Sequence, residues 1–122
     1  MRVRDVMSWP VATIRARETV WRAKREIART GLHHLVVTDS HNRVRGVVAA
    51  ADLRDAPWHG CVEDFMSKHV YPVGPNDSIE TAAGMMHDHA IGSLPVLDGS
   101  RLVGIVTTSD LLALVRANAV RM

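Results

Sequence analysis

Residues 3–8 read Val-Arg-Asp-Val-Met-Ser, and residues 62–67 read Val-Glu-Asp-Phe-Met-Ser, 59 positions later (62 − 3). Residues 43–48 read Arg-Val-Arg-Gly-Val-Val and match residues 101–106, which read Arg-Leu-Val-Gly-Ile-Val. The pair Asp-Leu begins four residues after each of these closing stretches. A repeat of this length predicts that each copy is one supersecondary unit, which needs its twin to bury an apolar face.

We therefore divide the chain into a first repeat, residues 1–60, and a second repeat, residues 61–122, and expect functional sites between them. Together they make one compact domain. The hydrophobic content of 47% argues against disorder. No apolar run approaches the roughly 20 residues that cross a bilayer, and the charged N-terminus precedes no apolar stretch, so no signal peptide is predicted. The single cysteine, Cys61, can form no internal disulfide, and we expect a cytoplasmic protein.

The charge of the chain is divided unequally between the repeats. The first repeat holds eleven Lys or Arg and six Asp or Glu, whereas the second holds four and seven. A chain with two charged halves of opposite sign favours a head-to-tail homodimer, in which the basic half of one copy lies over the acidic half of the other. Scattered solvated surface charge explains the same counts and stays an alternative.

Short apolar runs flanked by turn residues predict three strands in each repeat. The last two runs of each repeat are apolar almost throughout, which is typical of strands buried on both faces. The expected strands are residues 11–14, 35–38 and 44–49 in the first repeat and residues 70–73, 94–97 and 102–107 in the second.

Two helices are predicted in each repeat. The first helix of the chain follows Thr19 and ends at Gly31, and its counterpart shows apolar residues at helical spacing behind the capping residues 76–78. A further helix begins near Asp52 in the first repeat and near Asp110 in the second. Each repeat therefore reads β-α-β-β-α, and the fold class is mixed α/β (α+β).

Three stretches resemble a known family: Asp-Val-Met-Ser at 5–8, Gly-Ser-Leu-Pro-Val-Leu-Asp at 92–98, and Gly-Ile-Val-Thr-Thr-Ser-Asp-Leu at 104–111. With the order of the elements, they resemble the cystathionine-β-synthase domain, or CBS domain, and the tandem resembles a CBS pair, also called a Bateman module. The resemblance covers essentially the whole chain and leaves no room for an attached enzyme or transporter, so a stand-alone module is expected. It implies two β-α-β-β-α repeats, related by a pseudo-two-fold axis and packed through their sheets.

The segment Thr107-Thr108-Ser109-Asp110 lies where a strand ends and a helix begins. The Thr107 hydroxyl can cap the helix, and Asp110 can reach back to it. Free N–H groups at the positive end of the helix suit a phosphate, and an exposed carboxylate can accept hydrogen bonds from both hydroxyls of a ribose. An ordinary capped helix explains the same residues. The resemblance favours a ligand, because CBS pairs bind adenosine nucleotides or S-adenosylmethionine at this segment.

The first repeat departs from this pattern. Ala49-Ala50-Ala51-Asp52 keeps the acid but carries no hydroxyl that could cap a helix or meet a phosphate. The loss of a hydrogen bond to a charged phosphate costs about 1.5–3 kcal/mol, which is roughly ten- to a hundred-fold in affinity. We therefore predict unequal sites. The site at Asp110 is the stronger, and the site at Asp52 is weak, empty, or suited to a ligand without phosphates.

The resemblance further implies that each cleft takes its phosphate-ribose motif from one repeat and much of its base-binding wall from the other. By position, the nucleotide-binding residues of the Asp110 cleft are Thr107, Ser109, Asp110, Glu18, Ala23, Leu32, His33 and His34. Those of the Asp52 cleft are Asp52, Asp77, Ala82, Ile91, Gly92 and Ser93. Packing of the helices explains the small residues Ala23 and Ala82 equally well.

The expected function is that of a regulatory sensor without enzymatic activity, which binds AMP, ADP, ATP or S-adenosylmethionine and signals to a regulated partner protein. A homodimer formed through the helices is expected from the resemblance. Neither a catalytic motif nor a metal site is recognised, since His87 and His89 stand two apart on a helix and do not share a face. No required cofactor and no membrane contact are expected.

Two alternatives remain open. A pI near 9.2 and the basic cluster at residues 15–29 are compatible with nucleic-acid binding by the first repeat, although only one aromatic residue, Trp21, lies within that cluster. A structural dimerisation module with empty clefts is the other. We interpret Trp21 as a packing residue, with contact to a ligand or a dimer partner as the open alternative, and Trp9 and Trp58 as residues that hold the terminus and the linker in place.

Overall fold

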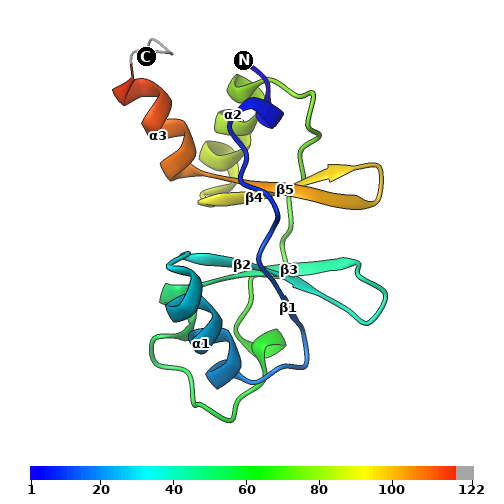
Figure 1. Cartoon of the computed structure of the whole chain (residues 1–122), viewed down its shortest axis with the longest axis vertical. Coiled ribbons are helices and arrows are strands. Elements are labelled where there is room, and N and C mark those ends of the chain that lie inside the picture. The colour runs from blue at the N-terminus through cyan, green and yellow to red at the C-terminus, as the bar shows by residue number, and fades with distance from the viewer. Residues whose placement is uncertain (118–122) are drawn as a thin grey trace. The chain divides into compact units, whose positions relative to one another are not determined.

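The computed structural model describes residues 1–117, which form two compact units (Figure 1). The first unit is Val11–Val70. The second unit joins Met1–Pro10 to the chain from Tyr71 onwards. Residues 118–122, which end the second repeat, lie outside the described residues.

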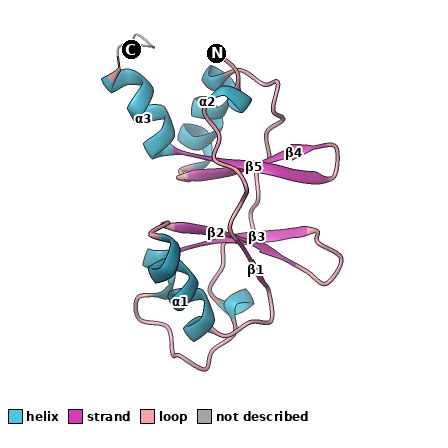
Figure 2. Cartoon of the chain, in the orientation of Figure 1, coloured by secondary structure: helices cyan, strands magenta, loops and turns pink. Residues whose placement is uncertain are grey.

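The first unit contains a three-stranded sheet and one α-helix (Figure 2). Strand β1 (Thr13–Arg15) pairs in parallel with β2 (His34–Thr38), which pairs antiparallel with β3 (Val44–Ala49). Helix α1 (Val20–Thr30) connects β1 to β2. Two 3-10 turns follow the sheet, at Ala50–Leu53 and Val62–Asp64.

The second unit contains an antiparallel hairpin of β4 (Ser93–Asp98) and β5 (Arg101–Thr107). Helices α2 (Ile79–His89) and α3 (Thr108–Arg116) lie over one face of this hairpin (Figure 1). A 3-10 turn at Val3–Asp5 lies beside α2, since the Ile79 amide donates to the carbonyl of Met1 (N···O 3.3 Å). No described helix is long and apolar enough to cross a membrane.

Each α-helix begins at a hydroxyl residue. The side chains of Thr19, Ser78 and Thr107 accept from the backbone N–H three residues later, which satisfies a donor that the helix leaves unpaired. Helix α1 ends where Gly31 adopts φ = 71°, in the left-handed region that favours glycine. These local signals are why the predicted helices at these three positions are confirmed.

Each unit has its own apolar core, formed where its helix and strands meet. Every second strand position and one helix face contribute side chains to both cores, as burial of one face requires, and the 3-10 turns add further apolar residues. The first core includes Val20, Ala23, Leu35, Val37, Val48, Leu53 and Val62. The second includes Val3, Val73, Ala82, Met86, Leu94, Val96 and Val106.

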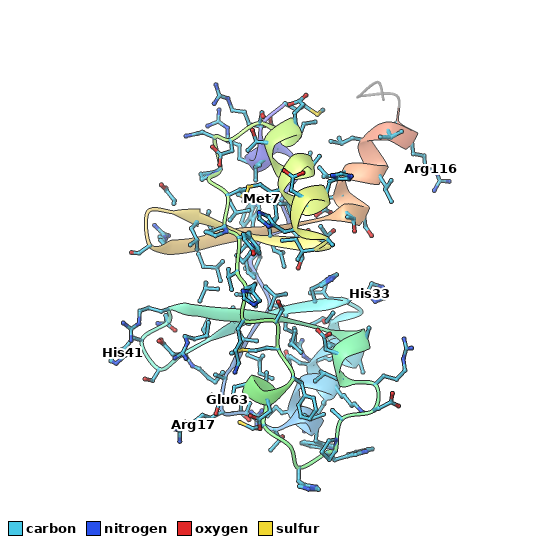
Figure 3. All side chains as sticks on the ribbon, turned by 180° about the vertical axis from the view of Figure 1, so that it is seen from behind. Met7, Arg17, His33, His41, Glu63 and Arg116 are labelled. Atoms are coloured by element: carbon cyan, nitrogen blue, oxygen red, sulfur yellow. The ribbon has the colours of Figure 1, made fainter. Side chains whose placement is uncertain are left out.

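The opening stretch of each sequence repeat packs against the closing strand of the other repeat. Met7 belongs to the second unit (Figure 3), where a Cβ added at Gly104 would lie 2.5 Å from its Sδ. Within the first unit, a Cβ added at Gly46 would lie 2.7 Å from Sδ of Met66. Two matching backbone bonds follow: Ser8 N donates to Ile105 O (2.9 Å), and Ser67 N donates to Val47 O (2.8 Å). The N-terminal segment of each sequence repeat therefore belongs to the compact unit that the rest of the other repeat forms.

Two elements differ in detail from their sequence-based prediction. The strand expected at residues 70–73 is reduced to a single parallel bridge between Val73 and Val96. The helix expected near Asp52 is only the four-residue 3-10 turn Ala50–Leu53. No side chain caps this turn, and Pro57 disfavours helical backbone at the residue before it, so the turn does not extend.

The three tryptophans are more exposed than the packing role expected for Trp21 and the anchoring role expected for Trp9 and Trp58 imply. Trp9, Trp21 and Trp58 have relative exposures of 71%, 42% and 63%. Two of them carry a cation over the ring instead: Lys24 Nζ lies 5.9 Å from the centroid of the Trp58 ring, and Arg25 Cζ lies 5.2 Å from that of Trp21. A sequence pattern identifies a large apolar side chain but does not say whether its own fold covers it.

Candidate functional site

The Thr107–Asp110 segment forms a complete capping box at the start of α3. Oδ2 of Asp110 accepts from Thr107 N (2.8 Å) and from Thr107 Oγ1 (3.0 Å), while Thr107 Oγ1 accepts from Asp110 N (3.3 Å). The Thr107 hydroxyl is thus engaged as both donor and acceptor within the cap. Its first role here is to hold α3 and the Asp110 carboxylate in place.

Groups that can meet a ligand remain at this helix start. Ser109 is exposed, and the Asp110 carboxylate uses only one of its two oxygens in the cap. Among residues 1–117, no hydrogen bond to Oδ1 of Asp110 is formed, so this oxygen can accept from a ribose hydroxyl. The positive end of a nine-residue helix lies beside it.

The residues before β4 lie next to the same helix start. Thr108 N donates to Gly92 O (3.0 Å), and Ser93 is the register partner of Thr107 across the hairpin. Ile91 and Gly92 are half-buried, and Ser93 is buried. The structure therefore brings Gly92 and Ser93 against the Asp110 motif of their own unit. Their expected contribution to the Asp52 cleft stays a prediction.

The first unit repeats this arrangement without the hydroxyl. Oδ2 of Asp52 accepts from Ala49 N (2.8 Å), and Ala50 N donates to His33 O (2.9 Å). Because residue 49 is alanine, no side-chain oxygen caps the turn that follows. Asp52 is exposed, and its second carboxylate oxygen is the counterpart of the free oxygen of Asp110.

His34 lies in β2 opposite Ala49, beside the Asp52 motif. It is half-buried, whereas His33 is exposed. Burial lowers the pKa of His34 below its ordinary value; the nearby His33 also lowers the pKa, and the Asp52 carboxylate partly offsets the shift. His34 is therefore held toward its neutral form, in which it can accept as well as donate a hydrogen bond.

The remaining predicted residues are placed less favourably for ligand contact. Ala23 and Ala82 have no exposed surface and belong to the cores of their units. Glu18 lies 3.9 Å from the Arg22 guanidinium, and the carboxylate of Asp77 accepts from Gly74 N at 2.8 Å. Leu32 is 43% exposed, directly after the end of α1. Packing is thus the role that the structure gives the two alanines.

The repeated fold and the paired acidic motifs agree with a family comparison. The CBS domain model matches residues 3–59 and again residues 62–117. The chain is a tandem pair of CBS domains. The predicted family resemblance and the predicted fold class are both confirmed.

Among curated proteins, this CBS pair is 34% identical over 116 residues to a homoserine O-acetyltransferase of Methanococcoides burtonii. The alignment covers 93% of this chain but only 24% of that enzyme. It is 31% identical over 111 residues to an L-aspartate semialdehyde sulfurtransferase of Methanosarcina acetivorans, covering 88% of the chain and 22% of that enzyme. The chain therefore spans about a quarter of the length of these relatives.

Two of the solved structures similar to this chain contain adenosine compounds. The CBS domain pair of protein MJ0100, in complex with 5-methylthioadenosine and S-adenosyl-L-methionine, aligns with a TM-score of 0.90 at 25% identity over 97% of this chain and 98% of that chain. The cytosolic domain of the Mg2+ channel MgtE, in complex with ATP, aligns with a TM-score of 0.78 at 30% identity over 89% of this chain and 46% of that chain.

Sequence reasoning located both acidic motifs but missed part of their geometry. It predicted that Asp110 reaches back to Thr107, but it did not recognise that Asp52 makes the matching contact with Ala49 N, nor that Thr108 N donates to Gly92 O. The spacing Thr-x-x-Asp and Ala-x-x-Asp was the available signal for the first contact. The contact between Thr108 and Gly92 depends on the pairing of β4 with β5, because it joins residues 16 positions apart, and residue spacing in the sequence does not specify that pairing.

Proposed function

We propose that this CBS pair is a regulatory module that binds an adenosine-bearing ligand and performs no chemistry on it. The observation that carries the proposal is the Asp110 carboxylate, held by its capping box with one oxygen free beside an exposed Ser109. Support comes from two similar solved structures, whose ligands are S-adenosyl-L-methionine with 5-methylthioadenosine in one and ATP in the other. The ribose of an adenosine compound supplies the paired hydroxyls that a carboxylate oxygen accepts from.

The two motifs are proposed to bind ligands of different charge. At Asp110, the nine-residue α3 offers the positive end of a helix and an exposed hydroxyl at Ser109, which suit a phosphate. At Asp52, a four-residue turn follows Ala49 and offers neither. We therefore assign AMP, ADP or ATP to the Asp110 site, and a phosphate-free compound such as S-adenosylmethionine to the Asp52 site.

Regulation follows from differential affinity. A ligand shifts the balance between two arrangements of a protein only by the difference in its affinity for them. In the proposed role, the bound and free forms of the pair differ in the surface offered to a regulated partner protein. Ligand binding then changes the free energy with which the pair binds its partner protein.

Isothermal titration of the chain with AMP, ADP, ATP and S-adenosylmethionine tests the proposal. Asp110→Asn is the sharper variant than Asp110→Ala, because an amide oxygen can still accept from Thr107 N and keep the cap. We expect Asp110→Asn to weaken nucleotide binding about ten- to a hundred-fold, with Asp52→Asn as the matched control that leaves it within about threefold. Asp52→Asn in turn is expected to weaken S-adenosylmethionine binding.

Thermal melting provides an independent readout. A site filled at about 100 times its dissociation constant stabilises the folded chain by about 2.7 kcal/mol. If none of the four ligands raises the melting temperature at millimolar concentration, the proposal is wrong. Equal loss of nucleotide binding in both variants would contradict the assignment of different ligands to the two motifs.

A further inference from the structure

The first unit contains a charged hollow that neither aspartate motif uses. It has a volume of about 410 Å³ and lies where the opening stretch of the second repeat meets β3. This volume is within the range of binding sites for small molecules. Two cations, two carboxylates and one thioether line the hollow, and they belong to Arg45, Glu63, Asp64, Met66 and Lys68.

The two carboxylates come from the 3-10 turn Val62–Asp64 (Figure 3). The turn is anchored to the core of the unit, since Val62 is fully buried and Glu63 N donates to Ala16 O (2.9 Å). Among residues 1–117, neither carboxylate forms a side-chain hydrogen bond or an ion pair. Both carboxylates can therefore accept hydrogen bonds from a ligand.

The two cations come from segments that a backbone bridge joins. Ser67 N donates to Val47 O (2.8 Å), and Val47 N donates to Ser67 O (3.1 Å). Arg45 lies two residues before Val47, and Lys68 directly follows Ser67, so the bridge fixes the backbone of both cations. Both are exposed, and in the described part of the chain neither pairs with an acid. Opposite charges therefore line the hollow without forming an ion pair.

The second unit shows that the shared fold does not require these charges. At the matching positions, Val103 and Trp9 replace the two cations, and a basic residue, Arg4, replaces one of the acids. The remaining acid, Asp5, serves the fold, because its Oδ2 accepts from Arg2 N (2.8 Å) at the start of the first 3-10 turn. The charges of the hollow thus have no role in the packing that both units share.

We propose that the hollow binds a free, neutral α-amino acid, whose carboxylate is met by Arg45 and Lys68 and whose ammonium group is met by Glu63 and Asp64. Two positive and two negative groups complement a zwitterion. They disfavour a phosphate or a metal cation, since each of these would meet two groups of its own charge. The Met66 thioether offers the amino acid's side chain an adaptable apolar contact.

Two-dimensional amide NMR tests the proposal with L-leucine and two chemical relatives. L-Leucinamide lacks the carboxylate, and N-acetyl-L-leucine lacks the ammonium group. We expect L-leucine at millimolar concentration to shift the amide signals of residues 63–68 and to bind about tenfold more tightly than either relative, because each relative loses charge-assisted hydrogen bonds. L-Alanine, L-methionine and L-glutamine extend the panel to other neutral side chains.

Two variants connect each charge of the ligand to a side chain. Arg45→Gln should weaken L-leucine binding about tenfold and leave L-leucinamide binding nearly unchanged, because the amide has no carboxylate to lose. Asp64→Asn should weaken L-leucine binding and leave N-acetyl-L-leucine binding nearly unchanged. Both positions are exposed, so circular dichroism should show native folding. Arg54→Gln and Asp55→Asn, at exposed positions of the same unit outside the lining, are the matched controls.

Three results would overturn the proposal. The first is that no amino acid of the panel shifts residues 63–68 at millimolar concentration. The second is that L-leucine and both relatives bind equally, which would leave only an apolar contact. The third is that Asp52→Asn abolishes L-leucine binding while Arg45→Gln does not change it, which would assign the amino acid to the adenosine site. The lining of the hollow contains neither Asp52 nor Asp110, so this proposal and the adenosine proposal can fail separately.

Discussion

The two units share a common fold but differ around their candidate sites and on the surfaces of their helices. Both place a methionine from the opening stretch of the other repeat on a glycine of the closing strand, and both use an aspartate to hold the turn after that strand. The second unit adds a hydroxyl cap, a longer last helix and an open apolar groove between α2 and α3, whereas the first adds exposed tryptophans over a basic helix. Shared positions therefore account for the fold, and divergent positions distinguish the proposed roles of the units.

The largest loss of stability is expected for substitutions of Gly46 and Gly104, where the opening stretch of each repeat packs against the closing strand of the other. A Cβ at Gly46 meets the backbone oxygen of Ser67 as well as the Met66 side chain, whereas a Cβ at Gly104 meets only the side chain of Met7 among its nearest contacts. Backbone yields less readily than a methionine side chain. We expect Gly46→Ala to lower the free energy of unfolding by about 2–3 kcal/mol and Gly104→Ala by about 1 kcal/mol, measured by urea denaturation.

Gly84→Ala in α2 is the matched control, because nothing lies within 4 Å of the added Cβ. At this site alanine should raise the free energy of unfolding by about 0.5–1 kcal/mol through helix propensity. Equal losses for Gly46→Ala and Gly104→Ala would show that the two crossings are energetically the same.

The next effect concerns the aspartates in the absence of ligand. Oδ2 of Asp110 accepts two hydrogen bonds, and Oδ2 of Asp52 accepts one. With about 1 kcal/mol for each bond, Asp110→Ala should lower the free energy of unfolding by about 2 kcal/mol and Asp52→Ala by about 1 kcal/mol. Chemical denaturation of both variants measures the difference, and a larger loss for Asp52→Ala would contradict the geometry.

The hydroxyl cap can be removed from one unit and installed in the other. Thr107→Ala should lower the free energy of unfolding by about 1 kcal/mol, because Asp110 N loses its acceptor. Ala49→Thr supplies a hydroxyl at the start of the 3-10 turn and should make the first unit more like the second. We expect it to stabilise the chain by up to about 1 kcal/mol, with thermal melting as the readout. No gain would mean that the short turn cannot use a cap.

The smallest effect is a pH dependence specific to the first unit. Because burial depresses the pKa of His34, the unfolded chain binds more protons than the folded chain between the folded pKa and the ordinary value of 6.5. The stability contributed by neutral His34 is therefore present above pH 6.5 and decreases as the pH falls toward the folded pKa.

His34→Ser introduces the residue found at the matching position, Ser93, and should flatten this part of the pH profile of unfolding. The control is His41→Ser, which removes an exposed histidine of the β2–β3 turn. An unchanged slope in His34→Ser would exclude His34 as the titrating group.

Local chemistry explains which predictions from sequence were accurate. Helix starts at Thr19 and Ser78 depend on a hydrogen bond to an N–H three residues away, and the end at Gly31 depends on one residue's φ. The apolar runs that became β2, β3, β4 and β5 were located within a residue or two for the same reason. The aspartates of both candidate sites followed from the same repeat pattern.

The sequence by itself determined the repeat, the three α-helices, the four paired strands of the hairpins and the inequality between Thr107 and Ala49. Only the tertiary structure decided that Met7 and Met66 each pack in the unit formed mainly by the other repeat, and that Val73 forms a single bridge instead of a strand. It also decided that Trp21 and Trp58 stay exposed beside a basic helix. The physical reason is separation along the chain. Periodicity and capping depend on neighbours within a few residues, whereas docking of a terminus, pairing of a short strand and coverage of a large side chain depend on surfaces that distant segments supply.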